Sequence, residues 1–208
     1  MRYFALATTG SLALLAASAS AGNSAGVNSA ILATQVITFH PAAPKGPERR
    51  GHCWTDSIAV DRPAAWRCMA GNAIHDPCFT NPELKDAVIC GADPARDERG
   101  FILKLTKPLP APTSRRLPNP RPWLLKLADG SICGLSTGTI ALVSGQEVPY
   151  GCSDSHKCTN DGCPYMTGLT SNLKRAKVWI AEKVAYRSSK TGLELLKRES
   201  IPVVAVWK

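Results

Sequence analysis

Gly134, Ser136 and Gly138 form a Gly-x-Ser-x-Gly pattern, which is typical of the turn that carries the nucleophilic serine of many hydrolases. Such a serine needs a histidine as its base and an acid that orients the histidine. His156 is the only histidine after Ser136, and Asp154 lies two positions before it. A small secreted serine hydrolase is therefore one hypothesis, although residues 139–143 favour a strand where this motif requires a helix.

The segment from Cys152 to Cys163 combines cysteines, His156 and carboxylates, a mixture that zinc sites also use. An even number of cysteines in an exported chain instead indicates disulfides. We therefore expect neither a metal ion nor a cofactor. A secreted inhibitor that presents the Cys152–Cys163 loop is a second hypothesis.

All eight cysteines lie in the last three quarters of the chain and predict a disulfide framework. Eight cysteines allow 105 pairings, and the sequence does not choose among them. The simplest hypothesis pairs neighbours along the chain. It gives Cys53–Cys68, Cys78–Cys90, Cys133–Cys152 and Cys158–Cys163.

The first residues predict export. Arg2 precedes a run of small and apolar residues from Phe4 to Ala17, and Ala19-Ser20-Ala21 is a suitable cleavage site. We expect residues 1–21 to be a signal peptide that is cut after Ala21, which makes the protein secreted, with no transmembrane segment after cleavage. The run is too short and too rich in Ala and Ser to favour a membrane span.

The positive charge is concentrated in the second half of the chain. Residues 22–100 contain 8 Lys/Arg and 9 Asp/Glu, whereas residues 101–208 contain 16 and 7. A basic half suits an anionic cell-wall polymer or an extracellular protein, and no nucleic-acid motif accompanies it. The residues predicted to form a binding face share the last third of the chain, namely Lys174, Arg175, Lys177, Trp179, Lys183, Arg187, Lys190, Lys197 and Arg198.

These side chains must be positioned by strands. Two apolar runs flank Asp129-Gly130, which predicts a hairpin with a two-residue type I′ turn. That turn pairs Leu127 with Ile132 and Lys126 with Cys133. Leu125, Leu127 and Ile132 would then share the core face.

The remaining elements predict a mainly β fold, either a small antiparallel barrel or a sandwich. Residues 22–52 are predicted to be a flexible arm, and residues 53–208 one disulfide-stapled domain. Its first part, residues 53–90, is predicted to be a loop-rich lobe with a short helix over residues 63–69. Six prolines between residues 107 and 122 predict an extended loop.

Several stretches across residues 53–208 combine cysteines with tryptophans, prolines and glycines: Cys53-Trp54-Thr55, Ala65-Trp66-Arg67-Cys68, Asp76-Pro77-Cys78-Phe79, Leu105-Thr106-Lys107-Pro108-Leu109-Pro110, Ala128-Asp129-Gly130 with Cys133, Tyr150-Gly151-Cys152, and Trp179 with Ala181-Glu182-Lys183-Val184. Together they resemble a family of uncharacterised secreted actinobacterial proteins. The resemblance implies an exported β domain with six cysteines, to which Cys158 and Cys163 are an addition. It implies no catalytic residue.

The sequence therefore favours a secreted, disulfide-rich binding or structural protein of the cell envelope that is not an enzyme. A basic face in the last third would engage an anionic polymer or a protein partner. The serine hydrolase and the inhibitor remain alternatives.

Overall fold

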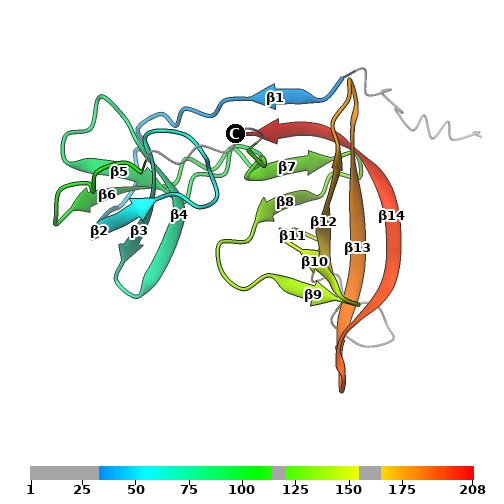
Figure 1. Ribbon diagram of the computed structural model, residues 1–208. Helices are drawn as coiled ribbons and strands as arrows, with labels where there is room; N and C mark the ends of the chain where they lie inside the picture. The colour runs from blue at the N-terminus through cyan, green and yellow to red at the C-terminus, as the bar shows by residue number, and fades with distance from the viewer. Residues whose placement is uncertain (1–32, 114–119, 155–164) are drawn as a thin grey trace, which may run out of the picture. The chain divides into compact units, whose positions relative to one another are not determined.

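The computed structural model describes residues 33–113, 120–154 and 165–208. All regular elements in these ranges are strands, which confirms the predicted mainly β class (Figure 1). None of the described segments is a helix that could span a membrane. The strands form two closed arrangements. One is a small barrel near the start of the chain, and the other is a larger ring that contains most of the second half.

The first barrel consists of five consecutive strands: β2 (Glu48–Asp56), β3 (Ala65–Ala70), β4 (Ala73–Thr80), β5 (Ala87–Cys90) and β6 (Phe101–Leu105). Each strand is antiparallel to the next, and β2 closes the barrel by pairing parallel with β6. The parallel pair is a consequence of the odd number of strands, because an up-and-down order returns to its start in the same direction.

Two disulfides staple this barrel. Cys53–Cys68 joins directly opposite residues of β2 and β3, and Cys78–Cys90 does the same for β4 and β5. All four cysteines are buried in the barrel core with Val88, Phe101 and Leu103. So small a core buries little apolar area, and cross-links compensate for that shortage.

The structure corrects one prediction for this part of the chain. The helix predicted over residues 63–69 is absent, because residues 65–70 form β3. The predicted disulfide-stapled lobe is present, and its strands form the closed barrel. Within the range predicted to be an arm, Gln35–Ile37 forms β1 and residues 48–52 begin β2.

The second arrangement is a ring of six strands: β7 (Leu124–Leu127), β8 (Ile132–Leu135), β11 (Tyr150–Cys152), β12 (Met166–Lys174), β13 (Trp179–Ser189) and β14 (Gly192–Trp207). Every pairing is antiparallel, and β14 closes the ring on β7, with Val206 opposite Leu125. One core cluster receives side chains from all six strands, including Leu127, Cys133, Leu169 and Val203. The third disulfide, Cys133–Cys152, links β8 to β11.

The strands outside the ring are attached to it through the long strand β14, with which β1 and β9 pair. Strand β1 pairs parallel with its end, and the hairpin of β9 (Ala141–Val143) and β10 (Gln146–Val148) joins it at Leu193. A further apolar cluster includes Phe79 of β4, Trp123 just before β7, Leu124 of β7 and Trp207 of β14. Residues from both closed arrangements therefore share one buried core.

The β7–β8 hairpin forms as predicted, but its register is shifted by one residue. Leu125 lies opposite Cys133 and Lys126 opposite Ile132. Gly130 N donates to Leu127 O and Leu127 N to Ser131 O, so three residues form the loop instead of two. Within this loop only Gly130 has a positive φ, of 84°. This is a type I turn followed by a left-handed glycine, the usual three-residue alternative to the predicted type I′ turn.

The shifted register decides which side chains reach the core. Leu125, Leu127 and Cys133 are buried in the ring cluster, whereas Ile132 packs at the edge of the cluster that contains Trp123. A slip of one residue moves a side chain to the opposite face of a strand. The disulfide at Cys133 consequently lies inside the ring.

Candidate functional site

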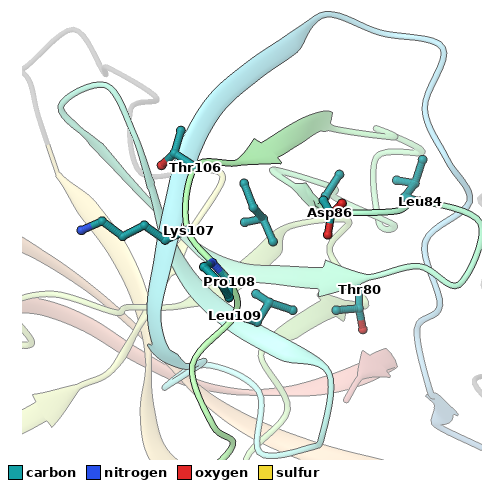
Figure 2. Close-up of a pocket in the computed structure, with 9 residues that line it drawn as sticks. Thr80, Leu84, Asp86, Thr106, Lys107, Pro108 and Leu109 are labelled. Carbon is teal, nitrogen blue, oxygen red and sulfur yellow. The ribbon is translucent and has the colours of Figure 1, made fainter.

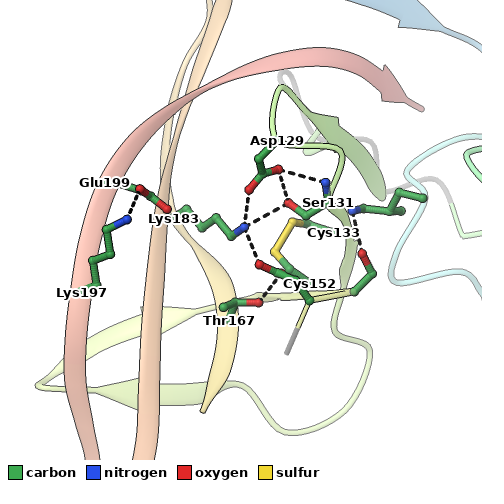
Figure 3. Close-up of polar contacts among 11 residues, drawn as sticks. Asp129, Ser131, Cys133, Cys152, Thr167, Lys183, Lys197 and Glu199 are labelled. Atoms are coloured by element: carbon green, nitrogen blue, oxygen red, sulfur yellow. Dashed lines mark hydrogen bonds and ion pairs between the residues drawn. A yellow bond between two sulfur atoms is a disulfide. The ribbon is translucent and has the colours of Figure 1, made fainter. Parts of the chain in front are cut away.

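A buried ammonium group, that of Lys183 on β13, lies inside the ring and makes three hydrogen bonds. Its side chain follows Trp179 and Ala181 on the same inward face of the strand, and the residue is only 4 % exposed. Its Nζ atom donates to Asp129 Oδ2 at 2.5 Å, to Asp154 Oδ2 at 2.8 Å and to Ser131 Oγ at 3.1 Å (Figure 3). The three donor hydrogens of a lysine are therefore all used.

Three separate elements bring these partners to Lys183. Asp129 and Ser131 come from the loop between β7 and β8, and Asp154 follows the end of β11. The Cys133–Cys152 disulfide holds β8 to β11 beside them (Figure 3). We call the cluster of Lys183, Asp129, Asp154, Ser131 and Thr167, whose hydroxyl donates to Asp154 Oδ1, the Lys183 network.

The network holds all three ionisable groups in their charged forms. Burial acts to lower the pKa of Lys183, but its hydrogen bonds to Asp129 and Asp154 outweigh burial and raise that pKa above 10.5. Burial acts to raise the pKa of both carboxyl groups, and their hydrogen bonds with Lys183 and a neighbouring hydroxyl lower each pKa below 3.8. The resting state is thus one cation between two anions.

A hollow of about 360 Å³ adjoins the Lys183 network. Lys183, Asp154 and Thr167 line it on one side, while Leu196 and the ion pair of Lys197 with Glu199, 2.6 Å apart, come from β14. The hollow therefore lies directly beside the ammonium and carboxylate groups of the network.

A second polar feature surrounds the turn between β12 and β13. Lys174, Arg175 and Lys177 are exposed there, and the Arg175 guanidinium donates to the carbonyl of Pro120, next to exposed Arg121. We call Arg121, Lys174, Arg175 and Lys177 the basic cluster. Among the described residues, none of these four cations has a carboxylate within ion-pair distance.

Two buried aromatic residues, Trp179 and Tyr150, lie near the basic cluster. The Arg175 guanidinium lies 5.2 Å from the ring centre of Trp179, which is 7 % exposed, and Lys208 Nζ lies 5.4 Å from it. Tyr150 donates its hydroxyl to Pro122 O. Burial raises the pKa of Tyr150 to about 12, although the nearby positive charges of Arg121 and Arg175 oppose that rise.

The structure divides the nine residues predicted to form a binding face. Lys183 and Trp179 are buried, so their assignment to a surface was wrong. Three cations are paired within the sheet, namely Arg187 with Glu194, Lys197 with Glu199 and Arg198 with Glu182. Lys174, Arg175, Lys177 and Lys190 are exposed and have no ion pair among the described residues.

The residues suggested for a serine hydrolase are not arranged as a triad where they are described. Ser136 Oγ donates to the carbonyl of Thr139, and the segment after Ser136 leads to strand β9 instead of a helix. Asp154 is bound by Lys183 and Thr167. His156 lies outside the described residues, and the elbow geometry is absent around Ser136.

The cysteines agree with the neighbour pairing in three cases, Cys53–Cys68, Cys78–Cys90 and Cys133–Cys152. Cys158 and Cys163 lie outside the described residues, so the fourth pair stays a prediction. The sulfurs of Cys68, Cys78 and Cys90 lie within 4.8 Å of one another. All three are oxidised and therefore do not provide the thiolates that a zinc site needs.

The first barrel contains one buried carboxylate, on Asp76 of β4. It accepts hydrogen bonds from Ser57 Oγ, from Ile58 N at 3.2 Å and from Arg67 Nη1 at 3.4 Å. Burial raises its pKa, against the lowering effect of the Ser57 hydrogen bond. Ser57 Oγ also accepts from Ala59 N and Val60 N, so this arrangement holds the turn after β2 in place.

A hollow of about 490 Å³ lies between residues of β4, β5, β6 and the chain that follows β6 (Figure 2). Leu84, Pro108 and Leu109 give it apolar walls. Its charged residues, Asp86 and Lys107, are exposed, and the Lys107 side chain extends away from the other labelled residues. No convergent set of buried polar groups is present among its lining residues.

Reasoning from the sequence missed Asp129, Ser131 and Thr167 as members of a polar site. The Asp-Gly pattern at Asp129 predicts only a turn. The available signal was the position of Lys183, which alternates with Trp179 and Ala181 and therefore shares their buried face. A lysine at such a position needs buried acceptors.

Comparison of the chain with protein-family models, curated proteins and solved structures gives no match.

Proposed function

We propose that this chain is an exported, disulfide-stapled binding protein of the cell envelope, which holds an anionic polymer through the basic cluster. The supporting contrast lies within the predicted binding face. Arg187, Lys197 and Arg198 are each neutralised by a glutamate, whereas the cations of the basic cluster have no acidic partner among the described residues. Uncompensated exposed cations are the groups that attract phosphate or carboxylate chains.

The contacts that hold Arg175 in place suit this role. Arg175 is held over Trp179 and by the Pro120 carbonyl, so part of its ordering precedes any ligand. The guanidinium has five N–H donors, and the hydrogen bond from Nη2 to Pro120 O uses only one of them. Three disulfides favour an oxidising compartment, in agreement with the predicted export.

The test compares two variants that lose the same formal charge. The first is Lys174→Gln with Arg175→Gln and Lys177→Gln. The matched control is Arg187→Gln with Lys190→Gln and Lys197→Gln, at the far end of β13 and at β14. The probe is long-chain polyphosphate, with binding followed by fluorescence anisotropy at several salt concentrations.

We expect the first variant to bind about tenfold more weakly at low salt and to depend less on salt, because three ion contacts are lost. The control should keep most of its affinity. Equal losses in both variants, or binding that ignores salt, would contradict the proposal. Undetectable binding of the unaltered protein to polyphosphate, together with capture of a protein from an envelope extract, would favour a protein partner instead.

The two alternatives have less support. The hydroxyl of Ser136 is bound to the Thr139 carbonyl and no helix follows it, so its surroundings do not match a hydrolase elbow. The inhibitor hypothesis depends on residues 155–164, which lie outside the described residues, and it stays a hypothesis.

A further inference from the structure

The Lys183 network places an amine against two carboxyl groups inside the ring. Each carboxyl group binds Lys183 Nζ with one oxygen and accepts protein hydrogen bonds with the other (Figure 3). Asp129 Oδ1 accepts from Ser131 N at 2.9 Å and from Ser131 Oγ at 2.6 Å. Asp154 Oδ1 accepts from Thr167 Oγ1. The nitrogen and both carboxyl groups are thus held in contact by the fold.

We propose that this network is a self-modification site, at which Lys183 Nζ and Asp129 Cγ become joined by an amide bond while Asp154 carries the proton. Amine and carboxyl group are the two components of an amide, and the only other product is water. Asp129 is assigned as the acyl group because two donors of Ser131 converge on its Oδ1. That is where negative charge gathers when a nucleophile adds to the carbon.

The bond-forming sequence needs no outside reagent. The ion pair first exchanges a proton, so that Lys183 becomes a neutral amine and Asp129 a carboxylic acid. The nitrogen lone pair then attacks Cγ, a C–N bond forms, and the electron pair of the carbonyl moves to Oδ1, where Ser131 donates to it. The neighbouring Asp154 remains a carboxylate up to this point.

Asp154 then transfers the proton that allows water to leave. Its carboxylate takes a proton from the attacking nitrogen and delivers it to the hydroxyl on Cγ. The carbonyl re-forms at Oδ1, the C–O bond breaks, and one water leaves toward the hollow that Lys183 and Asp154 line. Asp154 ends as a carboxylate, so the net charge of the network is unchanged. The new amide N–H then donates to Asp154.

The charged resting state makes this reaction slow, because it starts from the minor, neutral form of the pair. A single event per chain is sufficient, however, and the reactants never separate in the folded protein. Fixed contact of this kind replaces a bimolecular encounter and accounts for large accelerations in intramolecular reactions. The product would tie the β7–β8 loop to β13, beside the Cys133–Cys152 disulfide.

The direct test is the intact mass of the full-length chain after reduction and denaturation. We expect the unaltered protein to be one water lighter than the same chain carrying Lys183→Arg, after allowance for the substitution. A tryptic digest should contain one branched peptide that joins the segments of Asp129 and Lys183. An unaltered protein of full mass would overturn the proposal.

A succinimide at Asp129-Gly130 would also remove one water, and the Lys183→Arg variant separates the two products. A succinimide persists in that variant, whereas the amide cannot form. Loss of one water in both proteins would therefore overturn the proposal. We also expect Asp154→Ala to have full mass while keeping its three disulfides, and an Asp154→Ala chain that loses water as completely as the unaltered protein would contradict the role of Asp154.

Discussion

Lys183 Nζ lies 2.5 Å from Asp129 Oδ2, although 54 positions separate the two residues along the chain. Lys183 is almost fully buried, whereas the Asp129 side chain is 37 % exposed. The contact therefore joins the inside of the ring to a loop at its surface. Because Asp154 binds the same ammonium, one cation links the loop after β7, the end of β11 and the middle of β13.

Removal of the ammonium should be costly. In Lys183→Met the two carboxylates keep their places without a cation, and the free energy of unfolding should fall by about 3 kcal/mol or more. Lys190→Met, in the exposed turn between β13 and β14, is the control and should change it by less than about 0.5 kcal/mol. Urea unfolding at neutral pH measures both. Equal stability of the two variants would show that the network contributes little.

In chains whose Lys183 and Asp129 remain an ion pair, without the proposed amide, stability should depend on pH with a sign set by the same groups. The pKa values of Asp129 and Asp154 are lowered by folding, so their contribution is present above their unfolded value of 3.8 and is lost as pH falls through the folded values. The pKa of Lys183 is raised, so its contribution is present below 10.5 and is lost as pH rises through its folded value. The network is therefore most stabilising between these limits.

Denaturant unfolding of the unaltered protein and of Asp154→Asn between about pH 6 and pH 3 tests the acid side of this dependence. The unaltered protein should lose more stability over that interval, because Asn has no proton to gain. Asp76, which both proteins contain, contributes to the pH dependence of stability with the opposite sign. Burial raises its pKa, so its contribution is full below 3.8 and is lost as pH rises through its folded value. Identical pH profiles for both proteins would contradict the prediction for Asp154.

The three-residue loop of the β7–β8 hairpin depends on the conformation of Gly130. Its φ is 84°, and no atom lies within 4 Å of the position that a Cβ would take, so Gly130→Ala tests backbone conformation alone. We expect a loss of about 1 kcal/mol. Gly138→Ala also meets no neighbour, has no positive φ, and should be close to neutral. Thermal unfolding of both variants distinguishes them, and equal effects would argue against the left-handed turn.

The pairing of β11 with β12 makes a different demand on a glycine. Gly168 lies directly opposite Gly151 in this ladder. A Cβ at Gly168 would lie 2.3 Å from Tyr150 O and 2.4 Å from Val148 Cγ1, whereas a Cβ at Gly151 meets nothing. Gly168→Ala should therefore cost about 2 kcal/mol and Gly151→Ala little. A tolerated Gly168→Ala in chemical unfolding would mean that Val148 and Tyr150 move away from β12 easily.

Local patterns in the sequence identified several elements correctly. The apolar runs from Phe101 and from Ile201 to Trp207 favour strands by their residue types, and they lie in β6 and β14. The hairpin around Asp129-Gly130 was also predicted. Its register was not, because Asp-Gly suits two loop lengths and the choice depends on which faces are buried. Residues 63–69 were predicted as a helix from a proline signal that the barrel pairing of β3 overrides.

The candidate site was predicted only in part. Lys174, Arg175 and Lys177 were predicted as part of the basic face, and they are exposed around the turn between β12 and β13. Lys183 belongs to the same basic stretch, and its burial follows from the closure of the ring by β14 and β7. The amino-acid composition does not distinguish a buried lysine from an exposed one.

The amino-acid sequence by itself determined the alternation of apolar and polar residues within each strand, the even set of cysteines and the excess of positive charge. These are properties of neighbours along the chain. The tertiary structure alone decided which strands close each ring, the register of the hairpin, and which cations have a partner. Those outcomes depend on contacts such as Lys183 with Asp129, which form only when distant segments exclude water together, and no local pattern specifies them.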